Sequence, residues 1–289
     1  MTSENRKAYF YLLVTFVIWG SLYVVSKYTL GKISPFTLSF FRFLVAVVTL
    51  TLMLGKPKKK MEKSDWKYIL LIGGAGYFLA VGAQLLGTKY TGASVASLIN
   101  ALNPVTMTLF AMLLLGEAVT VRKITGIALA LVGVYVILGG GAAQLSMKGV
   151  LFSLFSVVVW SFVSVITRKV TKKYEPLQIT RNSVAAAMVF YFFAALAENR
   201  GGAAFEPDAA CVAALLYMGS ICTGLAYFLW NKSLSVLEAG VCSSFYPVQP
   251  LVASIMGILF LKEETGLNFW IGAVLIAVGI VISLRPGRK

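Results

Sequence analysis

Two polar segments, each broken by proline, interrupt apolar runs of the sequence. They are residues 97–104, Ser-Leu-Ile-Asn-Ala-Leu-Asn-Pro, and residues 243–250, Ser-Ser-Phe-Tyr-Pro-Val-Gln-Pro. A proline has no N–H, so it frees the carbonyl four residues before it, here those of Asn100, Ser243 and Tyr246. Lipid cannot satisfy such carbonyls, whereas a polar cavity or a bound solute can. The segments therefore predict two walls of a solute site; two ordinary proline kinks healed by Ser and Asn side chains are the alternative.

Helical spacing gathers the polar side chains of each segment on one face. The candidate binding residues on these faces are Ser97, Asn100, Asn103, Tyr246 and Gln249. An amide offers a donor and an acceptor at once, which suits a zwitterion or a heterocycle. The same residues could instead join neighbouring helices without any ligand.

Aromatic residues recur beside polar ones at helical spacing in four other runs. The pairs that share a face are Trp19 with Tyr23, Tyr77 with Gln84, Trp160 with Ser164, and Tyr227 with Trp230. Such rings can sandwich a planar or aliphatic solute. Trp and Tyr also collect at membrane interfaces, and for Trp230, beside Asn231 and Lys232, we favour that location.

Two arginines lie inside apolar runs. Arg42 is about 10 Å beyond Pro35 along a helix, and Arg181 is about 8 Å beyond Pro176. A cation at such depth costs roughly 2.5–3.5 kcal/mol unless it faces water, reaches the interface or finds a partner. Arg42 could bind a substrate carboxylate or organise backbone carbonyls; extension to the interface is the alternative for both arginines.

Acidic groups are scarce in the apolar runs. The chain has no histidine, and its 11 acidic residues fall in loops or at the ends of runs. Glu117 precedes a predicted helix, so we expect it to cap that helix. Proton antiport usually needs a titrating group at the cavity, so the sequence favours uniport or exchange over a proton-coupled antiporter.

The composition places these segments in a membrane. The 289-residue chain is 58% hydrophobic and 13% charged, against roughly 45–50% apolar and 25% charged in soluble domains. The apolar runs have the length of bilayer-spanning helices, not that of barrel strands. We predict an all-α polytopic membrane protein with spans at residues 8–27, 35–54, 66–87, 92–115, 120–139, 147–168, 176–197, 208–231, 238–261 and 266–284.

Charge fixes the expected orientation. Most of the 26 lysines and arginines lie on one side of these spans, so the positive-inside rule places both termini in the cytoplasm of a multi-pass protein of the plasma or inner membrane. Lipid headgroups account for the net charge of +15, and no nucleic-acid partner is predicted. The odd number of cysteines gives no metal or disulfide pattern, and no cofactor is expected.

The sequence repeats itself. A shift of 141 residues superimposes Trp19 on Trp160, and a shift of 146 superimposes Pro104 on Pro250 and Glu117 on Glu263. We expect a five-helix repeat at 1–139, a linker at 140–146 and a second repeat at 147–289. Five is odd, so the repeats must be inverted around a central cavity, as in many secondary transporters.

Small residues spaced along the last helix of each predicted repeat form packing positions and a possible dimer surface. They are Gly126, Gly133, Gly272 and Gly279. Small residues let helix backbones approach closely in a membrane. The expected assembly is a monomer or a homodimer.

Residues 93–104 and the following Leu-Leu-Leu-Gly-Glu of 113–117 resemble the signature of the EamA-like branch of the drug/metabolite transporter superfamily. Trp19-Gly20-Ser21, residues 35–42 and residues 250–263 are also similar to this family. The resemblance covers essentially the whole chain. It implies ten helices around a cavity lined mainly by the first, third and fourth helix of each half, and transport of amino acids, nucleobases or related metabolites, commonly outward.

These observations predict a secondary transporter of small metabolites, working by alternating access as an exporter through uniport or exchange. A channel is disfavoured, because the polar faces carry bulky rings and no ring of like charges. An enzyme is disfavoured, because catalytic motifs and paired acids are missing. The expected partners are a small-molecule substrate and the lipid bilayer.

Overall fold

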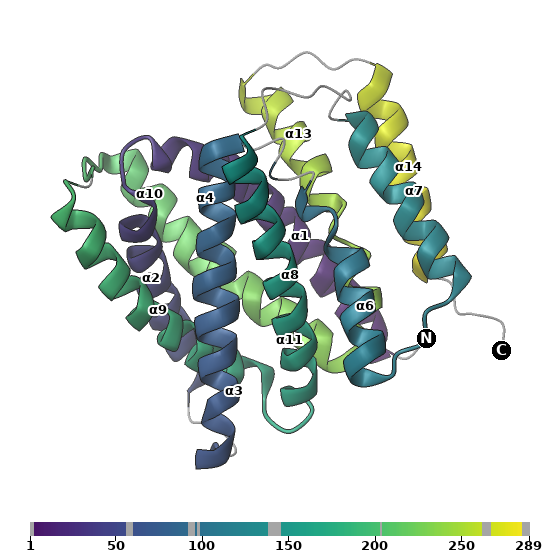
Figure 1. Cartoon of the computed structure of the whole chain (residues 1–289), viewed down its shortest axis with the longest axis horizontal. Helices are drawn as coiled ribbons and strands as arrows, with labels where there is room; N and C mark the ends of the chain where they lie inside the picture. Colours follow the sequence, from purple (N-terminus) through teal and green to yellow (C-terminus); the bar gives the residue numbers. More distant parts are fainter. Residues whose placement is uncertain are drawn as a thin grey trace.

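The fold of the described chain is helical throughout (Figure 1). The computed structural model describes residues 3–55, 60–91, 96, 99–137, 146–202, 204–261 and 267–284. Among these residues, β-pairing is limited to a single bridge between Ile33 and Phe205. Ser97 lies outside the described residues.

The helices follow one another with short connections. In the first half they are α1 (Ser3–Leu30), α2 (Pro35–Leu54), η1 (Lys63–Asp65), α3 (Trp66–Leu71), η2 (Ile72–Ala80), α4 (Val81–Thr91), α6 (Asn103–Leu115) and α7 (Val121–Ile137). In the second half they are α8 (Met147–Val170), α9 (Pro176–Arg200), α10 (Ala209–Tyr217), η3 (Met218–Leu225), α11 (Ala226–Val236), α12 (Ala239–Ser243), α13 (Val248–Leu261) and α14 (Leu267–Leu284).

Six helices are long and apolar enough to cross a membrane. They are α1, α2, the continuous helix Lys63–Thr91, α8, α9 and the continuous helix Ala209–Val236. The other four predicted spans have a different form in the described part of the chain. α7 has 17 residues and α14 has 18, and the spans predicted at 92–115 and 238–261 are broken near their prolines.

At both breaks, hydrogen bonds within the described chain satisfy the carbonyls that proline frees, through a side chain at the first break and through the backbone at the second. Asn103 Nδ2 donates to the Asn100 carbonyl at 2.8 Å. The N–H of Tyr246 donates to the Ser243 carbonyl, and that of Gln249 to the Tyr246 carbonyl, both at 3.0 Å. The expectation that these carbonyls await a solute is therefore wrong, because the Asn103 side chain bonds with the first carbonyl, as in the alternative of a healed kink, and tight i to i+3 turns replace the other two helical bonds. The breaks instead redirect side chains.

Helix contacts come in matching sets when the two halves of the chain are exchanged. α1 packs against α11 and α13, while α8 packs against α4 and α6. α2 packs against η3, while α9 packs against η2. Two further contacts, α2 with α9 and α7 with α14, join an element to its counterpart. Each half is thus packed largely against the other.

Both halves also contain a π-helical segment at the equivalent position. η2 begins at Ile72 and η3 at Met218, a separation equal to the repeat shift. Glycine follows each start and permits close contact: a Cβ on Gly73 would lie 2.6 Å from the Ser183 carbonyl oxygen, and one on Gly219 would lie 2.5 Å from Cβ of Val45. The π segments therefore coincide with backbone-close helix crossings.

α7 and α14 lie side by side (Figure 1), and their glycines face each other. A Cβ on Gly126 would lie 2.5 Å from the Gly279 carbonyl oxygen, and one on Gly133 would lie 2.7 Å from the Gly272 carbonyl oxygen. Among the described residues these glycines serve packing between α7 and α14. They are therefore occupied within the chain and not left as an outer surface for a dimer.

An aromatic cluster fills the middle of the bundle. Trp230 is only 1% exposed, and its ring centroid lies 5.7 Å from that of Phe16 and 5.7 Å from that of Trp19. The prediction that Trp230 sits at the membrane interface is wrong. Trp230 lies within α11, which packs against α1 and α9. The nearby Lys232 therefore does not indicate that the Trp230 side chain is at the membrane interface.

Candidate functional site

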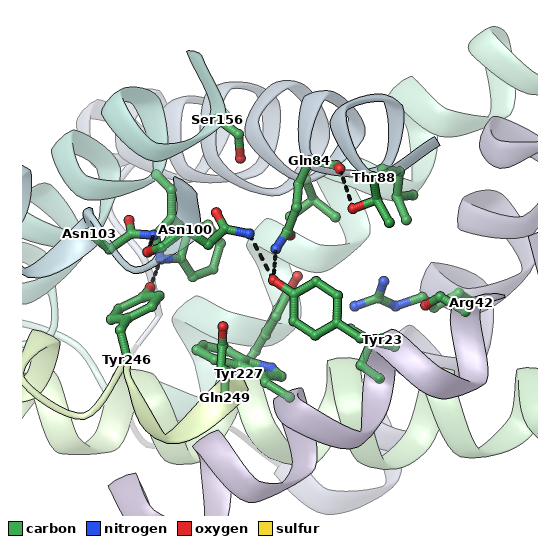
Figure 2. Close-up of a pocket in the computed structure, with 16 residues that line it drawn as sticks. Tyr23, Arg42, Gln84, Thr88, Asn100, Asn103, Ser156, Tyr227, Tyr246 and Gln249 are labelled. Atoms are coloured by element: carbon green, nitrogen blue, oxygen red, sulfur yellow. Dashed lines mark hydrogen bonds between the residues drawn. The ribbon is translucent and has the colours of Figure 1, made fainter. Parts of the chain in front are cut away.

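A cavity lies where the two halves meet (Figure 2). Its volume is about 60 Å³, well below the roughly 300–1,000 Å³ of pockets that hold drug-sized ligands. It is lined by Trp19, Leu22, Tyr23, Ser26, Arg42, Val81, Gln84, Leu85, Thr88, Asn100, Asn103, Ser156, Trp160, Tyr227, Tyr246 and Gln249. Both helix breaks contribute to this wall, so the interruptions bring distant parts of the chain to one place.

Tyr23 is the centre of a hydrogen-bond group on one side of the cavity (Figure 2). Its hydroxyl accepts from Asn100 Nδ2 at 2.8 Å and from Gln84 Nε2 at 3.1 Å. Two amides converge on one hydroxyl, which leaves its own proton free to point elsewhere. The arrangement fixes three side chains from three segments around the cavity.

A second polar group links the two breaks to α8. Ser161 Oγ donates to Asn103 Oδ1 at 3.0 Å, and Trp160 Nε1 donates to the hydroxyl of Tyr246. Two successive residues of α8 therefore hold the first-half break and the second-half break. A shift of α8 would move both walls of the cavity together.

The floor of the cavity is aromatic. The ring centroids of Trp19 and Trp160 lie 5.9 Å apart with nearly perpendicular planes, and both rings lie within 5.8 Å of the Tyr227 ring. Gly20 allows this arrangement, because a Cβ there would lie 2.6 Å from Cβ of Val252 on α13. Edge-to-face rings present both faces and edges to a bound group.

Arg42 places a positive charge at the cavity wall. The residue is 2% exposed, and its Nε donates to Thr223 Oγ1 at 2.5 Å. Within the described residues, no carboxylate forms an ion pair with it. Arg42 does not extend to the interface, and its charge faces the cavity from α2 (Figure 2).

Three polar side chains of the wall, those of Gln249, Ser156 and Ser26, are open. Gln249 and Ser156 point into the cavity from opposite sides (Figure 2), and none of the three has a side-chain hydrogen-bond partner among the described residues. An amide and a hydroxyl in this position can each donate and accept. They are the groups with which a solute can bond without displacing an internal partner.

The structure gathers most of the candidate residues predicted from sequence. The cavity wall contains Trp19, Tyr23, Arg42, Gln84, Asn100, Asn103, Trp160, Tyr227, Tyr246 and Gln249. Tyr77 and Ser164 are buried but do not line it. Tyr77 stacks on Tyr227 with ring centroids 4.6 Å apart and accepts a hydrogen bond from Asn231, so it supports the wall from behind.

Six residues that line the cavity were not among the binding residues predicted from the sequence: Leu22, Ser26, Val81, Leu85, Thr88 and Ser156. Helical spacing contained a signal for some of them. Ser26 lies seven residues after Trp19, and Thr88 lies four after Gln84, which puts each pair on one face. Ser156 lies four before Trp160 and could have been found in the same way.

A buried ion pair lies near one end of the bundle. Arg168 Nε, near the end of α8, lies 2.7 Å from Glu117 Oε1, in a contact whose N–H is not aligned for a hydrogen bond. Arg168 Nη1 donates to the carbonyls of Leu234 and Leu237 at the end of α11. We call this contact of Glu117 with Arg168 and α12 the latch.

Glu117 also caps a helix, although not the one expected. Its carboxylate accepts from the backbone N–H groups of Ala239 at 3.1 Å and Gly240 at 3.3 Å, in the first turn of α12. α7, the next helix in the chain, is not its partner in the described structure. A carboxylate at a helix N-terminus is stabilised by the helix dipole, so the latch joins α12 of the second half to the first half.

The sequence profile of the EamA-like transporter family matches residues 6–139 and again residues 147–285. The chain belongs to the EamA-like transporter family. This family falls within the drug/metabolite transporters, which makes the chain a multi-pass membrane protein of a transporter family.

Relatives of similar length support the assignment. The chain is 27% identical to an uncharacterized transporter of Archaeoglobus fulgidus, over 96% of this chain and 98% of that protein. It is 29% identical to the uncharacterized transporter YcxC of Bacillus subtilis, over 93% and 90% of the two chains. A solved crystal structure, 19% identical, shares the fold with a TM-score of 0.80 over 96% of both chains.

Proposed function

We propose that this EamA-like protein is a secondary transporter that exports small metabolites, such as amino acids or nucleobase-like solutes, by uniport or exchange. The central cavity is the solute site, and two inverted five-helix repeats at 1–139 and 147–289, ten spans in all, expose it alternately to each side. The protein lies in the plasma or inner membrane with both termini in the cytoplasm. The observation that carries the proposal is a cavity built at the junction of two interrupted helices, one from each half.

The contact pattern supports the inverted arrangement. The matching helix contacts and the equivalent π segments are those of two related units facing each other. Secondary transporters built this way hold their solute between the repeats, at broken helices. The profile of the family matches each unit separately.

The chemistry of the wall supports a small polar or zwitterionic solute. Arg42 suits an anionic group, Gln249 and Ser156 supply open donors and acceptors, and the rings of Trp19 and Trp160 suit an apolar part. A volume of about 60 Å³ holds few atoms, so a larger solute needs the halves to separate. The closed latch is consistent with a state sealed at one end.

The test is solute counterflow in proteoliposomes, with amino acids and nucleobases offered in separate assays. Gln249→Ala is the sharpest variant, because it removes an open amide and breaks no hydrogen bond of the described structure. We expect Gln249→Ala, Asn100→Ala and Trp19→Ala each to reduce flux by about tenfold or more, as expected for the loss of a polar contact or a packed ring. Trp270→Ala on α14, away from the cavity, is the control.

Two results would contradict the assignment of the site. One is unchanged counterflow kinetics in all three variants with insertion intact. The other is an equal loss in Trp270→Ala, which would mean that the assay reports general damage and not solute contact. A saturable exchange signal in the parent protein separates transport from a channel.

A further inference from the structure

A second cleft opens at the end of the bundle where α2 finishes and α3 and α9 begin. Its volume is about 340 Å³, and it shares no residue with the central cavity. The residues that line it are Thr51, Leu54, Gly55, Lys60, Met61, Trp66, Gln178, Arg181 and Asn182. We propose that this cleft binds the phosphate headgroup of an anionic phospholipid from the adjoining leaflet.

The charge of the cleft is positive and uncompensated in the described structure. Arg181 and Lys60 line it, and no acidic residue does. Among the described residues, no carboxylate forms an ion pair with either cation. A basic pocket between membrane helices attracts anionic headgroups, and an arginine fork fits phosphate oxygens.

Arg181 is held in place for such a ligand. Its Nη1 donates to Asn182 Oδ1 at 2.8 Å, and its Nε donates to Thr51 Oγ1 at 3.3 Å on α2. Guanidinium has five N–H donors, so these two hydrogen bonds leave other donors for oxygens in the cleft. These two hydrogen bonds anchor Arg181 between α9 and α2.

The surroundings have the polarity gradient of a phospholipid. Trp66 lines the cleft and is 45% exposed, as is common for Trp at the headgroup level. Leu52 and Val48, 81% and 54% exposed, continue along α2 from the cleft toward the middle of the helix. Acyl chains can lie on this apolar strip while the phosphate lies between Lys60 and Arg181.

The test measures lipid binding to purified full-length protein in neutral detergent, by native mass spectrometry and by thermal shift. The probes are phosphatidylglycerol, phosphatidylcholine with the same acyl chains, glycerol 1-phosphate and inorganic phosphate. We expect phosphatidylglycerol to bind at least about tenfold more tightly than phosphatidylcholine, and Arg181→Gln and Lys60→Gln each to weaken it by about tenfold. Arg200→Gln, at the opposite end of α9, is the matched control and should bind as the parent does.

Arg181→Lys keeps the positive charge but removes the planar guanidinium, so this variant should bind phosphatidylglycerol with intermediate affinity. Its binding also shows whether the weaker binding of Arg181→Gln comes from lost charge or from misfolding. Equal binding of the two phospholipids, or an equal loss in Arg200→Gln, would overturn the proposal. Inorganic phosphate or glycerol 1-phosphate binding as tightly as phosphatidylglycerol would also overturn it, because the source would then be a free anion. The readouts involve no transport, so they stand apart from the proposed function.

Discussion

At the residue scale, the cavity divides its polar groups into two kinds. Asn100 and Gln84 already donate to Tyr23, so a solute that bonds with them must replace an internal hydrogen bond and gains little net free energy. Gln249 and Ser156 have no such partner in the described structure. Selectivity for a solute should therefore depend more on Gln249 and Ser156 than on Tyr23 and the two amides that donate to it.

The ion pair at Asp208 gives a pH prediction for stability. Lys32 beside Asp208, the Cys211 N–H and the Tyr28 hydroxyl together lower the pKa of the Asp208 carboxyl from 3.8 to about 2. The folded-state pKa is depressed, so the stabilisation is present above pH 4 and is lost as the pH falls toward 2. We expect parent and Asp208→Asn to differ in Tm by about 3 °C or less at pH 7, since the pair is exposed, and the difference to vanish near pH 2.

Thermal unfolding in detergent between pH 2 and pH 7 measures this difference. Glu206→Gln is the control, because the Glu206 side chain forms no ion pair among the described residues. A Tm difference that stays constant down to pH 2 would contradict the pairing of Asp208 with Lys32.

Much of the wall could be predicted from sequence, because helical periodicity places Asn100, Tyr246 and Gln249 on shared faces. Which polar groups are satisfied could not be predicted. That depends on contacts between residues far apart in the chain, such as Ser161 with Asn103 and Trp160 with Tyr246. The depth of Trp230 also depended on neighbouring helices that its local sequence does not reveal.

At the element scale, the interrupted helices show why counting prolines overestimates the number of backbone carbonyls that lack a hydrogen-bond partner. The expectation counted only the helical bond that proline removes. A short turn or a nearby side chain restores a partner for each carbonyl, as the Tyr246 N–H does for Ser243 and the Asn103 amide does for Asn100, and costs less than leaving the carbonyl bare. The position of each break was predictable, whereas its local geometry was not.

The latch gives a prediction for the end of α12. Glu117→Gln keeps an oxygen for the Ala239 N–H but removes the charge opposite Arg168, and breaking a buried pair leaves the remaining charge uncompensated. We expect the sealed end to open more often, so that buried Cys242 on α12 reacts about tenfold faster or more with a maleimide. Cys211, buried at the start of α10, should react at its parent rate.

Mass spectrometry of the alkylated protein distinguishes the two thiols, and Cys242→Ser identifies the signal. A lower Tm with equal acceleration at Cys211 and Cys242 would mean that Glu117→Gln loosens the whole bundle. That outcome, or an unchanged rate at Cys242, would contradict a role for the latch in closing this end.

At the scale of the whole molecule, the shift of 146 residues found in the sequence recurs in the positions of the π segments. The shift that relates Gly73 to Gly219 also relates the starts of the two π segments. The sequence could not show that Gly126 and Gly133 face α14, because small residues serve equally well within a chain and between chains. Only the packing of the described helices distinguishes the two uses.

The composition of the cavity predicts how transport responds to protons. No aspartate, glutamate or histidine lines the wall in the described structure, so no carboxyl or imidazole there changes charge between pH 6 and pH 8. We expect the counterflow rate in proteoliposomes to be the same with and without an imposed gradient of one pH unit. A rate that follows the gradient would contradict uniport or exchange and would point to a coupling group elsewhere, with Glu117 the first to test.

The contact between α7 and α14 limits how the molecule can rock. α7 is the last described helix of the first half and α14 that of the second, and Gly126 meets the backbone of Gly279 with no room for a Cβ. Because the two backbones are in direct contact, α7 and α14 can tilt relative to each other but cannot slide along each other without a steric clash. In the proposed alternating-access cycle, we therefore expect the large displacements to occur far from the contact of α7 with α14, where α12 and α8 meet the ends of α6 and α11.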